Sequence, residues 1–237
     1  FTLLGTPPSV TYYEFFAPIA EGITWMRDIG LYWGITVQSP IKVGLTNQTS
    51  VAMRSSGTVT LRAEGGGVIG TVGANQQFGL TYDGQYVVNL PGGGVLNSGA
   101  PVRAEQPVDA VMTVDNIADN GAYNRFRGVL YVKNGSPGAW LVNEVDLELY
   151  LRGMGEVPDS WPMEAIKAQT VAARTFAARK MQAPRNEVFA IYDTVSDQVY
   201  NGYNSEVAKP NHTPASESTR GLVVRYGSDL AQTYYSS

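Results

Sequence analysis

Residues 153–180 read GMGEVPDSWPMEAIKAQTVAARTFAARK, and this stretch predicts a long helix that is entered through a proline-flanked turn. Pro162 suits the first turn of a helix, where its missing N–H is not needed, and Glu164 places negative charge at the positive end of the helix dipole. Ser160 or Trp161 is the expected cap. Apolar residues, mostly alanines, then occur on nearly every face, and such a helix is usually buried. We expect the rest of the chain to pack around it.

Glu156 is the candidate reactive group of the turn. It lies among Met154, Val157, Pro158 and Trp161, whose side chains would exclude water from a carboxyl group. Exclusion of water disfavours the charged form of a carboxyl group, so such a group holds a proton that it can donate. The alternative is that Glu156 caps the following helix or pairs with one of its basic side chains, and the residues alone favour neither role.

Lys167 and Arg174 are the cations that stand out within the expected helix. They are seven residues apart, so they lie on one face, two turns from each other. Cations on a buried helix need partners. Internal carboxylates are the commoner partners, and anionic or hydroxyl-rich groups of a substrate in a groove are the alternative.

Composition limits the classes of function. The chain has 237 residues, a net charge of -4 and no cluster of Lys and Arg, which argues against nucleic acid as a partner. It has no cysteine, which excludes disulfides and thiolate metal sites. No apolar run reaches the length of about 18 residues that a membrane span requires. Because the sequence starts at Phe1, we expect a start, signal peptide or anchor to have been removed.

The expected fold class is α+β, with a β-rich N-terminal half and a mixed α/β catalytic part built around the long buried helix. Residues 1–40 form an aromatic arm that either packs along the domain or docks on a neighbouring subunit or wall protein. Residues 41–122 form a β-rich subdomain in which Asp83-Gly84 predicts a hairpin. Residues 123–237 form the catalytic part. The expected strands of the subdomain are 41–46, 51–55, 58–63, 67–72, 78–82, 85–90 and 109–114.

The catalytic part is expected to open with two strands, 126–133 and 139–145, and a short helix, 147–153, capped by Asp146. Pro184 is expected to end the long helix. Everything after it reads as loops and short strands.

Polar and aromatic residues gather after the long helix. Asp193, Asp197, Gln198 and Tyr200 fall within eight positions, and sugar grooves mix aromatic faces with amide and carboxylate hydrogen bonds. Asp and Gln in a loop are more often turn formers, so both readings stay open. His212, the only histidine, has no second histidine or cysteine beside it. We expect it at the surface and expect neither a metal site nor a cofactor.

The stretches VNEVDLELYLRGMGEVPDSWPMEAIKAQTVAARTFAARK (142–180), YDTVSDQVYNGYNSE (192–206) and ASESTRGLVVRYGSDLAQTYYSS (215–237) resemble the stage II sporulation protein D family. Its members are peptidoglycan lytic transglycosylases or related cell-wall amidase enhancers. The resemblance covers residues 42–237 and is specific from Arg127 onward. It implies that Glu156 is the catalytic glutamate and that the β region forms one wall beside the catalytic part.

The chain departs from the family pattern in several places. The spacing from Tyr150 to Glu156 is shorter, and Val157 replaces the usual Met. The sequence stops at Ser237, where family members continue into a segment that helps to finish the groove. Some members bind zinc through a pair of Cys and His ligands, which this chain cannot reproduce because it has no cysteine.

The resemblance implies a lytic transglycosylase. A glutamic acid protonates the glycosidic oxygen between MurNAc and GlcNAc, and its carboxylate then deprotonates the MurNAc C6 hydroxyl to give a 1,6-anhydro product. A single carboxyl group suffices, although Asp159, Glu164, Asp193 and Asp197 are candidate partner carboxylates. The expected substrate contacts are Trp161, Lys167, Gln169, Arg174, Gln198 and Tyr200.

The expected partner is therefore the peptidoglycan glycan strand, and the expected location is extracellular or cell-wall associated. Two alternatives remain. One is a non-catalytic module that binds the wall or enhances an amidase. The other is a structural surface protein that recruited the domain, which the aromatic arm and the low charge favour.

Overall fold

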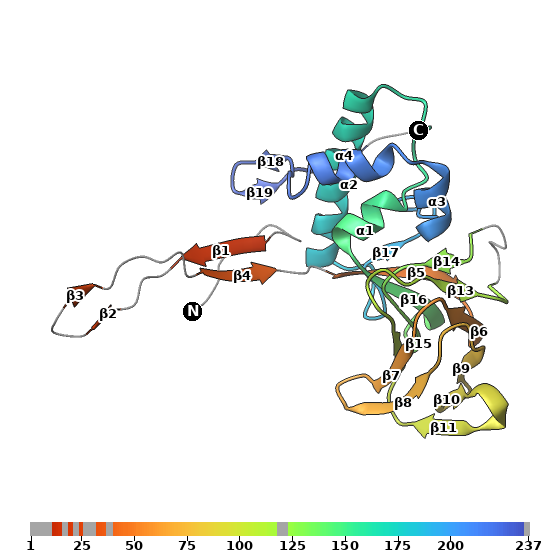
Figure 1. The fold of residues 1–237 in the computed structure, drawn as a ribbon. Helices are drawn as coiled ribbons and strands as arrows, with labels where there is room; N and C mark the ends of the chain where they lie inside the picture. Colours follow the sequence, from red (N-terminus) through yellow and green to blue (C-terminus); the bar gives the residue numbers. More distant parts are fainter. Residues whose placement is uncertain are drawn as a thin grey trace.

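The structure is a computed structural model that describes residues 40–117 and 123–234, together with the backbone of four short strands near the N-terminus. The fold class is α+β, and the N-terminal half is rich in strands, as the sequence predicted. In Figure 1 the two large sheets form the lower right part of the molecule and helices α1 to α4 gather above them.

The larger sheet contains strands from both halves of the chain. Its order is β17 (Ile191–Tyr192), β5 (Pro40–Asn47), β16 (Gly138–Asp146), β15 (Val129–Gly135), β12 (Val102–Glu105), β7 (Val59–Ala63) and β8 (Val68–Val72). Gly135 pairs with Gly138, so β15 and β16 form the hairpin expected for this part of the chain. β17 runs parallel to β5, and the other neighbours are antiparallel.

The smaller sheet is antiparallel throughout. Its order is β11 (Val95–Ser98), β10 (Tyr86–Asn89), β9 (Phe78–Tyr82), β6 (Ser50–Ser55), β13 (Met112–Val114) and β14 (Arg125–Phe126). Tyr82 pairs with Tyr86 across the turn that contains Asp83 and Gly84, and Gly84 has a φ of 100°. The predicted hairpin is therefore confirmed. Sequence analysis did not predict β11 and β12, which are short and interrupted by polar residues.

The two sheets pack face to face around one apolar core. Met53 and Leu80 of the smaller sheet and Leu61 and Leu130 of the larger sheet belong to the same buried cluster. β5 pairs with β16, and β13 pairs with β14, so both sheets cross the expected boundary between residues 122 and 123. The β-rich part and the catalytic part share one hydrophobic core.

Helix α1 (Leu147–Arg152) follows directly from β16. The side chain of Asp146 accepts a hydrogen bond from the amide of Glu148 at 2.9 Å, which caps the helix as predicted. Gly153 follows its last residue and leads into the turn that carries Glu156.

Helix α2 (Met163–Gln182) is the predicted long helix. Pro162 occupies its N-cap, so the expectation that Ser160 or Trp161 caps the helix was wrong. Only one side of the helix is buried, because Ala168 and Arg179 are exposed. Alanine favours helix formation at exposed positions as well, so the alanine pattern overstated the burial. The buried residues are Ile166, Thr170, Ala173, Arg174, Thr175 and Ala177.

Two further helices follow where the sequence predicted loops and strands. Helix α3 (Gly202–Ala208) packs on α1 and β14, and helix α4 (His212–Ser218) packs on α1 and α2. The prediction was wrong because both helices are short and carry Gly, Asn or Pro, which are typical of turns. β18 (Arg225–Tyr226) and β19 (Asp229–Leu230) then form a hairpin.

Near the N-terminus, β1 (Thr11–Phe15) pairs with β4 (Tyr32–Thr36), and β2 (Ile19–Ala20) pairs with β3 (Thr24–Trp25). The remaining residues of the expected arm lie outside the described residues, so its docking on another protein stays a prediction. Among the helices in the described part of the chain, none combines the length and apolar character needed to cross a membrane.

Candidate functional site

Glu156 lies in the turn between α1 and α2, and the segment after β17 holds this turn from one side. The amide of Gly155 donates to the Val199 carbonyl at 2.8 Å, and the amide of Asn201 donates to the Gly153 carbonyl at 2.9 Å. The amide of Val199 donates to Oε1 of Glu156 at 2.6 Å. A hydrogen bond to a carboxylate is charge-assisted and short. The half-buried carboxyl group therefore has a defined orientation.

Two glycines allow this close approach. A Cβ atom at Gly155 would lie 2.6 Å from Nδ2 of Asn201 and 2.8 Å from Cγ1 of Val199. A Cβ atom at Gly153 would lie 2.5 Å from Cε2 of Tyr200. Real Cβ atoms do not approach other atoms so closely. The glycines on either side of Met154 are therefore part of what positions the candidate acid.

The other side of the turn is held by side chains from α3 and the residue that follows it. Nζ of Lys209 donates to the carbonyls of Gly155 and Val157, at 2.8 Å in each case. Oγ of Ser205 donates to the carbonyl of Met154 at 2.8 Å. The backbone on both sides of the carboxyl group is thus tied to the α3 region.

Two carboxylates of the turn, Asp159 and Glu156, act on the ammonium group of Lys209. Burial lowers the pKa of Lys209, while the charges of Asp159 and Glu156 act in the opposite direction. Asp159 is itself engaged with the start of α4, because the amide of Asn211 donates to its Oδ1 at 2.9 Å. Nδ2 of Asn211 donates to the Asp159 carbonyl at 3.0 Å. Asp159 therefore fixes the turn and is not a free second carboxylate.

Trp161 and Lys167 are the predicted substrate contacts that the structure leaves accessible. Trp161 is 45% exposed. Nζ of Lys167 donates to Oε1 of Glu164 at 2.8 Å, and the Glu164 side chain is 84% exposed. Trp161 precedes α2, and Lys167 lies near the N-terminal end of this helix, next to the Glu156 turn. Their contact with a substrate stays a prediction.

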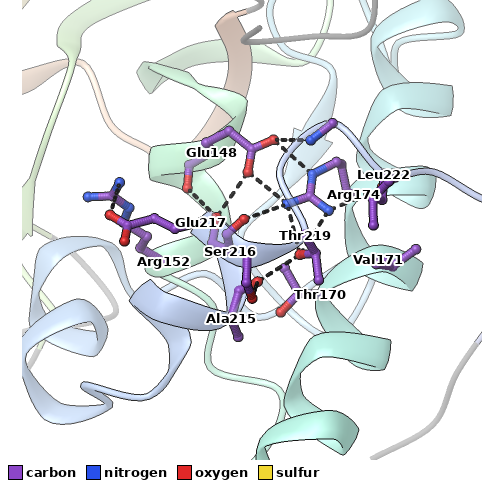
Figure 2. A network of polar contacts seen from close by, with 12 residues as sticks. Glu148, Arg152, Thr170, Val171, Arg174, Ala215, Ser216, Glu217, Thr219 and Leu222 are labelled. Carbon is purple, nitrogen blue, oxygen red and sulfur yellow. Dashed lines mark hydrogen bonds and ion pairs between the residues drawn. The ribbon is translucent and has the colours of Figure 1, made fainter.

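Arg174 lies in the interior, which corrects its predicted contact with substrate. Its Nε and Nη2 donate to the two carboxylate oxygens of Glu148 at 2.8 and 2.7 Å, and none of its surface is exposed. Further bonds reach the carbonyls of Leu222 and Ser216 at 3.1 and 3.3 Å. Figure 2 shows the guanidinium enclosed by this network. Of the two kinds of partner considered for Arg174, the structure shows an internal carboxylate. The reason is that α4 and the segment after it cover this part of α2.

Gln198 and Tyr200 are also buried, at 0% and 2% exposure, so neither reaches a ligand in this structure. Tyr150 donates to Oε1 of Gln198 at 3.0 Å, and Nε2 of Gln198 donates to the Ala173 carbonyl at 3.3 Å. Tyr200 donates to Oδ1 of Asn143 at 2.9 Å, and burial raises its pKa. The two residues tie the segment beside Glu156 to α1, α2 and β16, so their role is support.

His212 and Gln169 meet Glu156 at a small cavity beneath the turn. The cavity has a volume of about 10 Å³. His212 is 3% exposed, so its predicted surface position was wrong. The run from Pro210 to Pro214 reads as a loop, yet His212 opens α4. Pro214, within the first turn of that helix, was the signal that could have revealed it.

The environment of His212 keeps its imidazole neutral. Burial and the charge of Lys209 lower the pKa of His212. Asp159 and a hydrogen bond to the Val157 carbonyl act in the opposite direction and are weaker. A neutral imidazole offers one donor and one acceptor nitrogen beside the candidate acid.

The two aspartates of the predicted groove differ in environment. The side chain of Asp197 is fully buried: it pairs with Arg185 and Lys180 and accepts from the amide of Tyr192 at 2.9 Å. Burial acts to raise its pKa, but these hydrogen bonds hold the pKa below its ordinary value. Asp197 is thus structural, which corrects its expected place in a groove. Burial raises the pKa of Asp193 to about 7.

A groove of about 1140 Å³ lies at the opposite end of α2 from Glu156. The C-terminal half of α2 and residues between 221 and 234 line it, and its cations are Arg179, Lys180, Arg185 and Arg225. Within the described residues, no group of three or more His, Cys, Asp or Glu side chains is arranged to hold a metal ion. The turn of Glu156 and this groove are therefore separate features.

Comparisons with known proteins agree with the resemblance. The family model described as Stage II sporulation protein, SpoIID, matches residues 136–226. A protein of Bacillus subtilis (strain 168) named Amidase enhancer is 42% identical over 82 residues, which cover 35% of this chain and 10% of that protein. An uncharacterized protein of Brachyspira hyodysenteriae is 37% identical over 100 residues, which cover 41% of this chain and 27% of that protein.

These matches span about a quarter or less of each relative, 27% and 10% of their lengths. The family match contains the turn of Glu156, all of α2 and the segment that supports the turn. Residues 136–226 are therefore similar to the SpoIID family, and part of the chain is similar to an amidase enhancer.

Proposed function

We propose that this protein cleaves the glycan strands of peptidoglycan as a lytic transglycosylase, with Glu156 as general acid and then base. The observation that carries the proposal is the oriented, half-buried carboxyl group of Glu156, held at 2.6 Å by the Val199 amide within the region similar to the SpoIID family. The domain family and the amidase-enhancer relative support a function connected with the cell wall.

The proposed reaction needs one carboxyl group and no water. Glu156 donates its proton to the glycosidic oxygen between MurNAc and GlcNAc as the bond from that oxygen to MurNAc C1 breaks. The resulting carboxylate takes the proton of the MurNAc C6 hydroxyl, whose oxygen attacks C1. The products are a 1,6-anhydroMurNAc end and a free GlcNAc end, and Glu156 regains its proton. General acid–base catalysis of this kind contributes roughly 10²- to 10⁴-fold to rate.

Most of the neighbouring carboxylates bond to other groups of the protein, which supports a mechanism with a single carboxyl group. Ordinary glycosidases use two carboxyl groups on opposite sides of the bond. Asp159 bonds to the start of α4, and Asp197 is buried against Arg185. Glu164 pairs with Lys167 in solvent. Three of the four candidate partners are thus engaged elsewhere, and Asp193 is the fourth.

Trp161 and Lys167 are the proposed substrate contacts, because both side chains are accessible from solvent. An exposed indole offers an apolar face on which a sugar ring can stack. The Lys167 ammonium can bind the lactyl carboxylate or acetamido oxygen of MurNAc, because Glu164 holds it only loosely in solvent. Gln169 is half-buried and faces the cavity at Glu156, so it acts on the carboxyl group more directly than on the glycan.

Fragment analysis tests the proposal. The protein is incubated with purified peptidoglycan, both intact and stripped of its peptides, and the released fragments are weighed by mass spectrometry. We expect fragments that are one water lighter than hydrolytic products. Release of hydrolytic products alone would contradict the mechanism.

Two variants assign the reaction to Glu156. Glu156→Gln keeps the size of the side chain and is expected to abolish release of anhydro products. Asp109→Asn removes an exposed carboxylate in the β-rich part and is expected to leave release unchanged. Full anhydro-product formation by Glu156→Gln would remove Glu156 from the mechanism.

A non-catalytic role as an amidase enhancer is the second candidate. Among the described residues, the cavity at Glu156 holds only about 10 Å³, so a glycan would have to bind on the outer surface. This small cavity and the name of the Bacillus subtilis relative favour the alternative. Binding to sedimented peptidoglycan without release of fragments, together with faster cleavage by an added amidase, would establish it.

A structural surface protein is the third candidate, and its support lies in the N-terminal arm. We propose an extracellular or cell-wall location for all three candidates. The mass of the protein in solution separates the third from the others, because an assembly protein forms oligomers and a monomer argues against assembly.

A further inference from the structure

The cavity beneath the Glu156 turn is small and partly polar. Its volume of about 10 Å³ is close to the least space that holds one water molecule. The apolar lining consists of Leu151, Met154, Val157, Ile166 and Ala173. The polar lining consists of Glu156, Gln169, Thr170 and His212. A sugar does not fit, so any occupant is a single small polar molecule.

Two buried polar atoms at this cavity have no hydrogen-bond partner among the described residues. They are Nε2 of Gln169 and Nε2 of His212. A buried polar group left unpaired costs about 1–3 kcal/mol, so native structures rarely leave two in one place. The side chain of Thr170 is engaged, because its Oγ1 donates to the Ile166 carbonyl at 2.8 Å.

The two unpartnered atoms offer hydrogen bonds of opposite direction in one tautomer of His212. Nε2 of the imidazole has no partner, and the Val157 carbonyl acts on the ring to raise its pKa. We assign the hydrogen of the neutral ring to Nδ1, which makes Nε2 an acceptor. Nε2 of Gln169 is the amide nitrogen, which only donates. A donor and an acceptor thus belong to residues that line one cavity with Glu156.

The charged groups around His212 are Lys209 after α3 and Asp159 and Glu156 of the turn. Burial and Lys209 keep the ring neutral at neutral pH, because both lower its pKa. A protonated ring would turn Nε2 into a donor and remove the acceptor from the cavity.

We propose that one buried water molecule binds in this cavity and links Glu156 to His212, which makes His212 a positioning residue for the Glu156 carboxyl group. The water accepts a hydrogen bond from Nε2 of Gln169 and donates to Nε2 of His212 and to the carboxylate of Glu156. It thereby makes three hydrogen bonds, the number typical of buried waters.

The water fixes the carboxyl group from a second direction. The Val199 amide already holds Oε1 at 2.6 Å. With both bonds in place, the carboxyl group keeps one orientation while it loses and regains its proton. This consequence for catalysis rests on the proposed function, whereas the water link itself does not depend on activity.

Nuclear magnetic resonance tests the link directly, because His212 is the only histidine of the chain and its ring signals need no assignment. At pH 7.5 we expect protonated Nδ1, unprotonated Nε2 and a nuclear Overhauser effect between the ring proton Hε1 and a long-lived water. Gln169→Leu is expected to remove the water signal with the fold retained, and Asp109→Asn to preserve it. An Nε2–H tautomer, or a ring without a long-lived water in the unsubstituted protein, would overturn the proposal.

Kinetics on soluble, peptide-free glycan test the positioning role. We expect Gln169→Leu and His212→Leu to lower kcat about tenfold with little change in KM, because orientation of the acid is lost and glycan binding is not. His212→Gln retains an acceptor and is expected to recover part of kcat. Equal losses in His212→Leu and His212→Gln would contradict the positioning role.

The two proposals fail in different ways. Absence of any cleavage by the unsubstituted protein, with the water signal present, removes the lytic activity and leaves the link. Cleavage that depends on Glu156 in a protein without the water signal removes the link and leaves the activity.

Discussion

The amide of Val199 lies 2.6 Å from Oε1 of Glu156, although the two residues are 43 positions apart in the chain. A strand-like pairing makes this contact possible, because the amide of Gly155 bonds in turn to the Val199 carbonyl at 2.8 Å. The candidate acid is therefore oriented by backbone groups of a neighbouring segment, and changes to that backbone should affect it first.

Gly155→Ala should disturb this pairing. The new Cβ atom would lie 2.6 Å from Nδ2 of Asn201 and 2.8 Å from Cγ1 of Val199, so the segment must move away. We expect a loss of about 1–3 kcal/mol in the free energy of unfolding, measured in urea, and a larger relative loss of fragment release. Gly67→Ala is the control, because a Cβ atom there meets nothing within 4 Å. Equal effects of the two substitutions would refute the argument.

Arg174→Met should strongly destabilise the fold. Glu148 would keep a buried carboxylate without its partner, and breaking a buried ion pair in this way costs about 3–5 kcal/mol. Lys167→Met, which breaks a solvent-exposed pair on the same helix, is expected to cost no more than about 1 kcal/mol. Urea unfolding measures both variants. Recovery of part of the loss when Glu148→Leu is added would show that the unpaired carboxylate, and not the lost volume, is responsible.

Lys209→Met should loosen the turn from its other side. The carbonyls of Gly155 and Val157 would each lose a charged donor at 2.8 Å, at a cost of about 1–3 kcal/mol to the free energy of unfolding. The pKa of His212 should rise, because the charge of Lys209 lowers it in the native protein. Titration of the His212 ring signals checks this direction. Lys133→Met, which breaks a pair with Glu64 in the β-rich part, should leave that titration unchanged.

Asp193→Asn should stabilise the protein at high pH. Burial raises the pKa of Asp193 from 3.8 to about 7, so between these pH values the unfolded chain releases a proton that the folded chain keeps. The free energy of unfolding therefore falls as pH rises through this window. Asn does not ionise, so the variant should gain about 1–3 kcal/mol at pH 8 relative to the native protein and little at pH 4. Urea unfolding at both pH values measures it, and a gain that is the same at both would contradict the titration.

The elements that sequence predicted well are those specified by local residues. The Asp83-Gly84 hairpin, the Asp146 cap of α1 and the start of α2 near Pro162 depend on backbone preferences of a few neighbouring positions. Glu156 was proposed in the same way, from a turn that resembles a known family, and its catalytic role stays a prediction. Such features can be read without knowing what packs on them.

The features that sequence missed depend on contacts between distant segments. Lys167 and Arg174 lie on one helical face, yet only Arg174 is buried, because Ser216 and Leu222 reach that part of α2 and not the other. His212 was expected at the surface because its flanking residues are turn formers, and the burial follows from the packing of α4 on α1 and α2. Nothing in the spacing of these residues encodes that packing.

The family match begins at residue 136, within the turn between β15 and β16. A protein cut at that point would lose β15 and β5, the two strands that flank β16 in the larger sheet. Both edges of β16 would then be open to pairing with other chains, which favours aggregation. The region that matches the family is thus shorter than the region that the fold requires. A fragment chosen for expression should begin no later than β5.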